Sequence, residues 1–145
     1  MRIVIQRVNS AAVFINNNKY SFIQDGLLCL VGFCNDDNES DFIWSINKII
    51  NLKIFKQNQS VQDVGGQLLI VSQFTLFASI KKGSKPSWIR AAKPDIAKKM
   101  YDNFLNICFQ KFPNKIQAGI FGSDMQIHSV NDGPVTICID TKNKE

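Results

Sequence analysis

The chain is poor in the residues that most often build metal sites and catalytic dyads. Among its 145 residues there is one histidine, His128, and there are four cysteines, none of them in a CxxC pair. Structural zinc sites need Cys and His clustered at short spacings, and that pattern is missing. A catalytic triad or a Cys–His pair would have to use His128, which stands in an alternating, strand-like run. We therefore predict no metal, no cofactor and no histidine-based triad.

Long apolar runs are also missing. No stretch reaches the ~18 uninterrupted apolar residues of a membrane span. The opening residues, MRIVIQRV, lack the apolar core and the cleavage site of a secretory signal. We expect no membrane contact and a cytoplasmic location. Cys29, Cys108 and Cys138 stand among aliphatic and aromatic residues, which predicts small buried hydrophobes in a reducing compartment.

What is present is the composition of an ordinary globular protein. Hydrophobic residues make up 45% of the chain and charged residues 20%. A chain of this length can bury a sizeable core without disulfides or metal. We find no linker and no internal repeat, and we predict a single domain over residues 1–145.

The hydrophobic periodicity predicts many short strands and two long helices. A change to a helical period predicts one helix over 39–51, with Asn38 as its N-cap, and a second over about 94–112, with Pro94 at its first position. Strands are expected at 2–8, 11–15, 20–23, 27–33, 67–77, 116–118, 125–130 and 135–140. Because the early strands follow one another as a meander, we expect an α/β fold with a mixed sheet.

Positive charge is concentrated in one segment. Residues 81–99 hold seven basic residues and one acidic residue, a net charge of +6, while the rest of the chain sums to −1. A local field of this kind attracts polyanions, and Trp88 within the segment could stack on a base. Charge alone leaves two interpretations open, contact with nucleic acid or a solvated surface rich in lysine.

Two short segments place polar residues where packing does not require them. Ser72, Gln73 and Thr75 come at the end of an apolar run, where they either satisfy local backbone groups or form a site. The segment Asn-Asp-Gly-Pro at 131–134 has the chemistry of a turn. On the residues alone, an ordinary hairpin turn is the favoured interpretation of this second segment.

Taken together, the two segments resemble the D-aminoacyl-tRNA deacylase family. GGQLLIVSQFTL carries the family's SQ-x-x-L motif at Ser72, Gln73 and Leu76. FGSDMQI followed by NDGPVT carries its N-x-G-P-x-T motif at Asn131, Gly133, Pro134 and Thr136. The segments RIVIQRV, DGLLCLVG, KPSW, AAKP and MYDNF are also similar to the family, so the resemblance covers nearly the whole chain in order.

The resemblance implies an ester hydrolase with barrel-like β layers and both helices packed on one face. Its substrate would be a D-amino acid joined to the terminal ribose of tRNA, or glycine mischarged on alanine tRNA. The enzyme would be a homodimer in which a cis Gly133–Pro134 peptide enters the site of the other subunit. Backbone carbonyls of that peptide would occupy the space that an L side chain needs, so that L-amino acids are excluded.

The resemblance also implies which residues form the site. The predicted catalytic residues are Ser72, Gln73, Phe74 and Thr75. The predicted substrate-binding residues are Gly133, Pro134, Asn131, Thr136, Phe121 and Met125. The predicted contacts with tRNA are made by Lys81, Lys82, Lys85 and Arg90, which lie in the basic segment.

The catalytic group is less evident than the substrate. Thr75 is the natural nucleophile by residue type, but no evident base stands near it in the sequence. The resemblance favours catalysis assisted by the ribose 2′-hydroxyl, with backbone N–H donors near Gln73–Phe74 and Thr75. Thr75 would then line the site without being acylated. The alternatives are a non-catalytic nucleic-acid-binding protein of the same fold, a small-molecule esterase that uses Thr75, and a structural dimer module.

The chain departs from the family pattern at several positions outside the two motifs. FKQNQSVQDVGG is shorter than the corresponding loop, and Trp88 stands where Phe is usual. Phe77 occupies a position that is often small, Ser123 one that is often Ala, and His128 is unusual in its strand. We expect Phe77 to narrow the pocket or to alter its contact with adenosine. Because none of the changes touches the two motifs, we expect them to affect affinity rather than the reaction.

Overall fold

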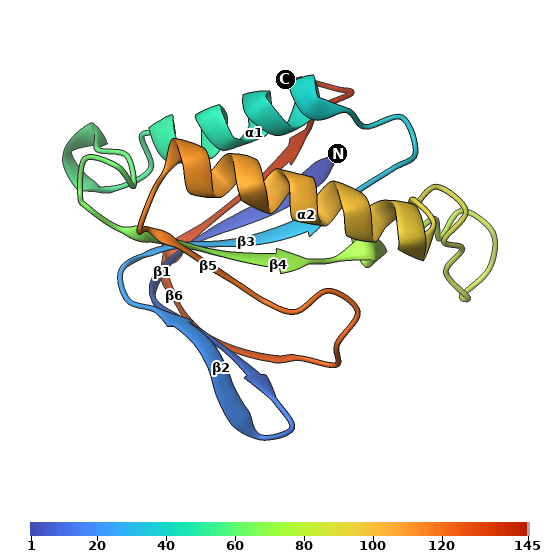
Figure 1. The fold of residues 1–145 in the computed structure, drawn as a ribbon, viewed down its shortest axis with the longest axis horizontal. Helices are drawn as coiled ribbons and strands as arrows, with labels where there is room; N and C mark the ends of the chain where they lie inside the picture. Colours follow the sequence, from blue (N-terminus) through green and yellow to red (C-terminus); the bar gives the residue numbers. More distant parts are fainter. Residues whose placement is uncertain (145) are drawn as a thin grey trace.

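The computed structural model describes residues 1–144 and shows one mixed sheet with two helices on one of its faces (Figure 1). The helices are α1 (Glu39–Asn51) and α2 (Pro94–Lys111), with short 3₁₀ turns η1 (Lys56–Asn58) and η2 (Phe74–Phe77). The strands are β1 (Arg2–Ile15), β2 (Asn18–Ile23), β3 (Gly26–Gly32), β4 (Gln67–Ser72), β5 (Ile116–Ala118) and β6 (Gln126–Asp140). No helix in this part of the chain is long and apolar enough to cross a membrane.

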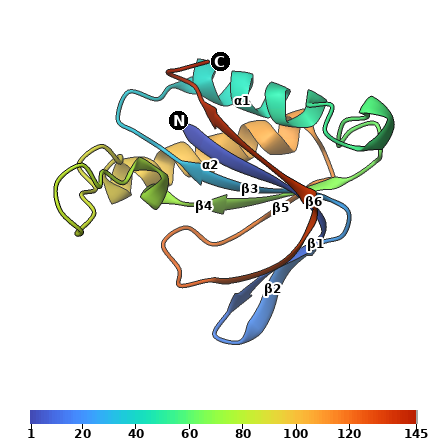
Figure 2. The ribbon, with the colours of Figure 1, turned by 180° about the vertical axis from the view of Figure 1, so that it is seen from behind.

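Strand β1 organises the sheet because it pairs antiparallel with three other strands. Its first half lies beside β3 and its second half beside β2, while β6 pairs with both halves. Strands β4 and β5 continue from β3 in parallel. The predicted mixed sheet is therefore confirmed. Strand β2 bends away from the helices (Figure 2) and contacts β4 and β5, which produces the barrel-like second layer.

Two hydrophobic clusters fill the two sides of β3 and β4. Alternate side chains of these strands point to opposite faces. Leu27, Cys29, Leu68 and Ile70 join the larger cluster under the helices, which includes Phe42, Ile46, Ile49, Phe104 and Cys108. Leu28, Leu69 and Val71 join the smaller cluster inside the curl of β1 and β2. The prediction that 27–33 is covered on both faces is confirmed, because every residue of β3 except Leu30 is buried.

Both predicted helices are confirmed. Asn38 caps α1, and it forms a capping box with Asp41, which accepts a hydrogen bond from the Asn38 backbone N–H at 3.1 Å. Pro94 is the first residue of α2, whose end lies one residue before the predicted one. The buried hydroxyl of Tyr101 on α2 donates to the carbonyl of Ile70 at 3.0 Å. This bond attaches α2 to the strand that leads into the polar segment at 72–75.

Several predicted strand boundaries are wrong. The expected strands 2–8 and 11–15 form the single strand β1, because β6 pairs with both parts. The expected strand 67–77 ends at Ser72, where the chain enters the 3₁₀ turn η2.

Of the three cysteines expected to be buried, Cys138 is exposed, because it lies on the outward face of β6. Cys29 and Cys108 are buried as predicted, and burial raises the pKa of both thiols.

The prediction of a hairpin turn at 131–134 is also wrong. The segments before and after it both pair with β1, so β6 continues through it as one strand. Asn131 lies opposite Val8, and Thr136 lies opposite Gln6. Residues 132–135 therefore face a single residue of β1, Arg7, and the surplus length bulges out of the sheet.

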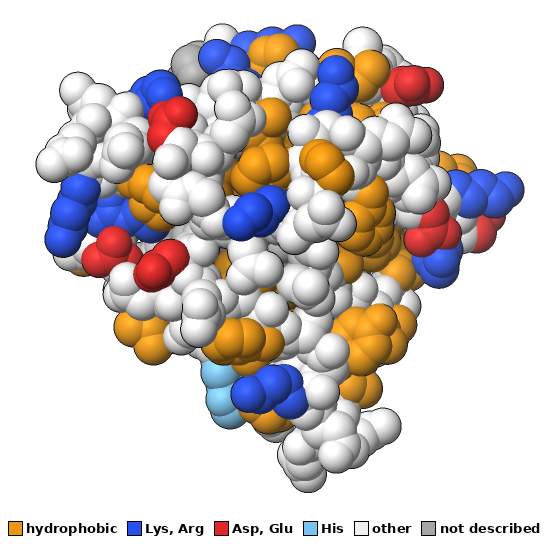
Figure 3. All heavy atoms as spheres, turned by 60° about the vertical axis from the view of Figure 1, so that its left-hand side comes forward, with side chains coloured by type: hydrophobic (Ala, Val, Ile, Leu, Met, Phe, Trp, Pro, Cys, Tyr) orange, Lys and Arg blue, Asp and Glu red, His pale blue; other side chains and the backbone are white. Residues whose placement is uncertain are grey.

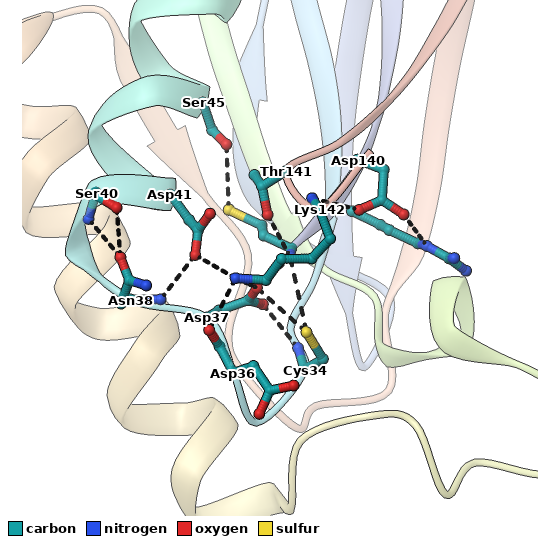
Figure 4. A network of polar contacts seen from close by, with 12 residues as sticks. Cys34, Asp36, Asp37, Asn38, Ser40, Asp41, Ser45, Asp140, Thr141 and Lys142 are labelled. Atoms are coloured by element: carbon teal, nitrogen blue, oxygen red, sulfur yellow. Dashed lines mark hydrogen bonds and ion pairs between the residues drawn. The ribbon is translucent and has the colours of Figure 1, made fainter. Parts of the chain in front are cut away.

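A buried polar network joins the start of β1, the end of β6 and the start of α1 (Figure 4). The α-ammonium of Met1 forms an ion pair with the carboxylate of Asp37, and both side chains are inaccessible to solvent. The same ammonium donates to the hydroxyl of Thr141 at 2.8 Å. The ammonium of Lys142 forms an ion pair with the carboxylate of Asp41, with 2.8 Å between nitrogen and oxygen. The network holds the ends of two adjacent strands against the first turn of α1.

Candidate functional site

A cavity of about 760 Å³ opens at the C-terminal end of β4. Ser72, Gln73 and Phe74 form the wall that follows the strand. Trp88 and Ile89, from the segment before α2, form a second wall. Phe121 and Met125, from the loop before β6, form a third. The structure thus brings five of the predicted site residues, from two separate segments, around one hollow.

The sharp turn after β4 depends on a close approach between two backbone segments. The N–H of Gln73 donates to the carbonyl of Val31 on β3 at 2.7 Å. A Cβ atom on Gly32 would lie 2.7 Å from the carbonyl oxygen of Gln73, closer than real side chains approach. Gly32 therefore allows the chain to turn here, and η2 follows directly. Ser72, Gln73 and Phe74 are placed at the cavity by this turn.

Thr75 lies within the turn and is bonded to Gln73. The side-chain amide of Gln73 donates to the hydroxyl of Thr75 at 2.5 Å. Thr75 is not among the residues that line the cavity. A carboxamide cannot take a proton from a hydroxyl, so this partner does not activate Thr75 as a nucleophile. Gln73 and Thr75 are therefore in contact, but Gln73 cannot act as the base for a Thr75 nucleophile.

The walls of the cavity are mainly aromatic and aliphatic. The ring of Phe74 packs edge-on against Trp88, with 5.2 Å between the ring centroids. Phe121 packs against Tyr101 at 5.8 Å, which connects the third wall to α2. Phe74 is 54% exposed and Trp88 is 42% exposed, so both rings offer open faces to a ligand. An apolar hollow with a few polar groups at one end suits a flat ligand that carries a polar reactive bond.

The second motif lies elsewhere in the chain. Asn131, Gly133, Pro134 and Thr136 are exposed in the bulge of β6, and none of them lines the cavity. The Gly133–Pro134 peptide is cis, as the resemblance implied, and Gly133 has a left-handed backbone with φ of 126°. Within one chain, the structure does not bring the two motifs together.

Arg7, which lies on β1, supports the bulge of β6. Its Nε atom lies 2.9 Å from a carboxylate oxygen of Asp132. The N–H is not aligned with that oxygen, so the contact is an ion pair without a hydrogen bond from Nε. Another guanidinium nitrogen donates to the carbonyl of Ile54, and the group lies 5.9 Å from the ring centroid of Phe55. An isolated arginine in a strand-like run carries no local signal for this role.

The predicted tRNA-contacting residues divide into two groups. Lys81, Lys82 and Arg90 line a smaller hollow of about 220 Å³. Lys85 is exposed in the same loop but does not line that hollow. In Figure 1 this loop lies beside the first turn of α2, next to the end of β4. The basic segment therefore borders the cavity.

His128 is not placed to take part in a catalytic triad. Its ring packs on Phe14 of β1, with 4.6 Å between the centroids. Figure 3 shows the only imidazole of the chain at the molecular surface. Within residues 1–144, no group of three His, Cys, Asp or Glu side chains is arranged to hold a metal ion.

Comparison with known proteins gives consistent matches over nearly the whole chain. Residues 4–140 match the family model described as D-Tyr-tRNA(Tyr) deacylase. A D-aminoacyl-tRNA deacylase of Flavobacterium johnsoniae is 51% identical and aligns over all of both chains. A protein of the same description from Bacteroides thetaiotaomicron is 47% identical, again over all of both chains.

Solved structures match as well. A structure described as a c-Myc DNA unwinding element binding protein is 35% identical, with a TM-score of 0.91, and the match covers 97% of this chain and 98% of that one. A structure described as a probable eukaryotic D-amino acid tRNA deacylase has a TM-score of 0.83 at 18% identity, over 95% of this chain and 97% of that one. The second match indicates a shared fold.

Proposed function

The chain belongs to the D-Tyr-tRNA(Tyr) deacylase family of hydrolases, and from this premise we propose how its two motifs act. The proposed reaction is hydrolysis of the ester that joins a D-amino acid to the terminal ribose of tRNA. Glycine mischarged on alanine tRNA is a second proposed substrate. The proposed place of action is the cytoplasm.

The observation that carries the proposal is the cavity at the end of β4. Its volume, about 760 Å³, falls in the range of ~300–1,000 Å³ that is typical of small-ligand sites. Phe74, Trp88 and Phe121 supply aromatic surface for the terminal adenine. Ser72 and Gln73 supply polar groups at the end where the ester would lie. A terminal aminoacyl-adenosine therefore fits both the size and the polarity of the hollow.

Selection by handedness is proposed to depend on a second copy of the chain. The residues Asn131, Gly133, Pro134 and Thr136 of the bulge are exposed and do not line the cavity of their own chain, which supports a second subunit as the source of Gly133 and Pro134. In the proposed homodimer, their carbonyls occupy the space of an L side chain. A main-chain wall tests only the direction of Cβ, so different D side chains and glycine are all accepted.

The proposed chemistry uses the RNA and the protein backbone. The ribose 2′-hydroxyl assists the attack on an ester that is already reactive, and the protein positions the ester and stabilises the oxyanion. The N–H of Gln73 is already bonded to Val31. The first N–H groups of a helical turn have no partner within it, so the amide of Phe74, a residue that lines the cavity, is the proposed oxyanion donor.

The experiment compares purified protein on D-tyrosyl-tRNA and L-tyrosyl-tRNA, with glycyl-tRNA of the alanine acceptor as a third substrate. We expect rapid release of D-tyrosine and glycine and little release of L-tyrosine. Equal rates on the two tyrosyl esters would contradict selection by handedness. The proposal involves no metal, so EDTA should leave the rate unchanged.

One competing function has a specific observation in its favour. A protein 35% identical to this chain is described as binding a DNA element, which keeps open a nucleic-acid-binding protein without hydrolysis. Tight binding of nucleic acid with no deacylation of D-tyrosyl-tRNA would support that alternative. Hydrolysis of free D-amino-acid esters at the same rate as the tRNA ester would instead support a small-molecule esterase.

A further inference from the structure

A second, smaller hollow lies beside the cavity, between the strand end and α2. Ser79, Lys81, Lys82, Ser87, Ile89 and Arg90 line its volume of about 220 Å³. Ser79 and Ser87 are held opposite each other by two backbone hydrogen bonds of 2.9 Å each. The paired backbone closes the loop at its base and presents the two serine residues and the basic side chains around one space.

The chemistry of this hollow suits an anion. Three basic residues and two serines line it, and no acidic residue does. Within residues 1–144, no carboxylate forms an ion pair with Lys81, Lys82 or Arg90. Arg90 donates one N–H to the carbonyl of Ala78 at 3.1 Å, which orients the guanidinium and leaves its other donors available. Arginine and hydroxyl donors of this kind commonly bind phosphate.

The hollow adjoins the cavity through a shared residue. Ile89 lines both spaces, and it is 85% exposed. Trp88, the residue before it, lines the cavity. A nucleic-acid strand whose last nucleoside fills the cavity would therefore pass over Ile89 and bring its preceding phosphate to the basic hollow.

We propose that Ser79, Lys81, Lys82, Ser87 and Arg90 form a subsite for the backbone phosphate that precedes the terminal nucleoside of the substrate RNA. This inference rests on the proposed function, because the terminal nucleoside must occupy the cavity. The subsite gives the basic segment a defined role, since one phosphate is held at a set distance from the ester. It also makes the enzyme prefer an ester on RNA to the same ester on a free nucleoside.

The test uses three D-tyrosyl esters that differ in phosphate content. The first is the ester of adenosine, which has no phosphate. The second is the ester of cytidylyl-(3′→5′)-adenosine, which has a single backbone phosphate, and the third is D-tyrosyl-tRNA. For the unmodified protein we expect kcat/KM to rise about tenfold or more from the first ester to the second, as a charge-assisted hydrogen bond would provide.

The variants Arg90→Gln and Lys99→Gln form a matched pair. Both remove one positive charge from the basic segment, but Lys99 does not line the hollow. We expect Arg90→Gln to reduce the advantage of the dinucleotide ester over the adenosine ester by about tenfold. Lys99→Gln should keep the full advantage. If both substitutions reduced this advantage equally, the subsite would be overturned, because the effect would then come from the net positive charge of the segment and not from a specific phosphate contact.

Binding measurements separate this inference from the proposed function. If none of the three esters is hydrolysed, the proposed function fails. Calorimetric titration with cytidylyl-adenosine that carries no amino acid, and with adenosine, then tests the subsite directly. Equal affinities for the two would overturn it. Inorganic phosphate that binds as tightly as cytidylyl-adenosine would also overturn it, because the hollow would then take a free anion rather than the RNA backbone.

Discussion

In the turn that follows β4, the side-chain amide of Gln73 donates a hydrogen bond of 2.5 Å to the hydroxyl of Thr75. The hydroxyl is thereby bonded to a group that cannot accept its proton. We predict that Thr75→Ala retains deacylation of D-tyrosyl-tRNA within about tenfold of the unmodified rate, because losing a positioning contact costs less than losing a nucleophile. Single-turnover kinetics measures this directly.

A covalent intermediate is the outcome that would contradict this prediction. Mass spectrometry of protein quenched during turnover should show no D-tyrosyl adduct on the peptide that contains Thr75. Thr75→Ser is the matched control, since it keeps the hydroxyl that Gln73 contacts. We expect this variant to have a rate at least as high as that of Thr75→Ala.

Removing the support of the β6 bulge should reduce activity more than stability. We predict that Arg7→Gln lowers kcat/KM for D-tyrosyl-tRNA about 100-fold, because Asp132 and the residues beside it lose their ion pair with β1. Lys19→Gln, which removes an exposed charge from β2, should have no such effect. Thermal unfolding measured on both variants separates a repositioned bulge from a weakened fold. Similar activity of the two variants would contradict the prediction.

The ion pair between Met1 and Asp37 should contribute strongly to stability. Both partners are inaccessible, and removing one of them leaves a buried charge without its counter-ion. We predict that Asp37→Asn lowers the free energy of unfolding by about 3–5 kcal/mol, as measured by urea denaturation. Asp36→Asn is the control, because Asp36 is exposed one residue away. A loss of similar size in the control would show that net charge, and not the buried pair, is responsible.

The carboxylate of Asp41 should make the fold sensitive to acid. Burial raises the pKa of Asp41, but hydrogen bonds from Lys142 and from the Asn38 backbone outweigh burial and hold it below its ordinary value. A lowered pKa in the folded state contributes stability above the unfolded value, and that stability is lost as the pH falls through the folded value. We predict that Asp41→Asn lowers the free energy of unfolding by about 1 kcal/mol at pH 7. This difference in stability between the variant and the unmodified protein should narrow below about pH 4.

Urea unfolding at several pH values between 3 and 7 measures this convergence. Glu39→Gln removes an exposed carboxylate from the same turn of α1 and serves as the control. Its stability should follow that of the unmodified protein at every pH. If the free energies of unfolding of Asp41→Asn and the unmodified protein differed by the same amount at every pH, the proposed role of Asp41 in acid sensitivity would be contradicted.

Part of the cavity wall could be predicted from the sequence, by a local break in the apolar pattern and by the family resemblance. Ser72 and Gln73 interrupt an apolar run, and this interruption marks the mouth of the cavity. The resemblance predicts Phe121 and Met125, and both residues line the same cavity. The contribution of Ile89 was not predicted, because its place between two hollows depends on how the loop before α2 folds.

The sequence by itself determined the two helices, the doubly covered strand β3 and the concentration of charge at 81–99. These features depend on periodicity, capping and composition, which are properties of neighbouring residues. Only the tertiary structure decided that 131–136 bulges instead of turning back. Both of its flanks pair with β1, more than 100 residues earlier in the chain, and this pairing places Arg7 beside Asp132. The separate pairing of β3 with β4 places Gly32 beside Gln73. Such contacts are selected by the free energy of the whole fold, and no local pattern records them.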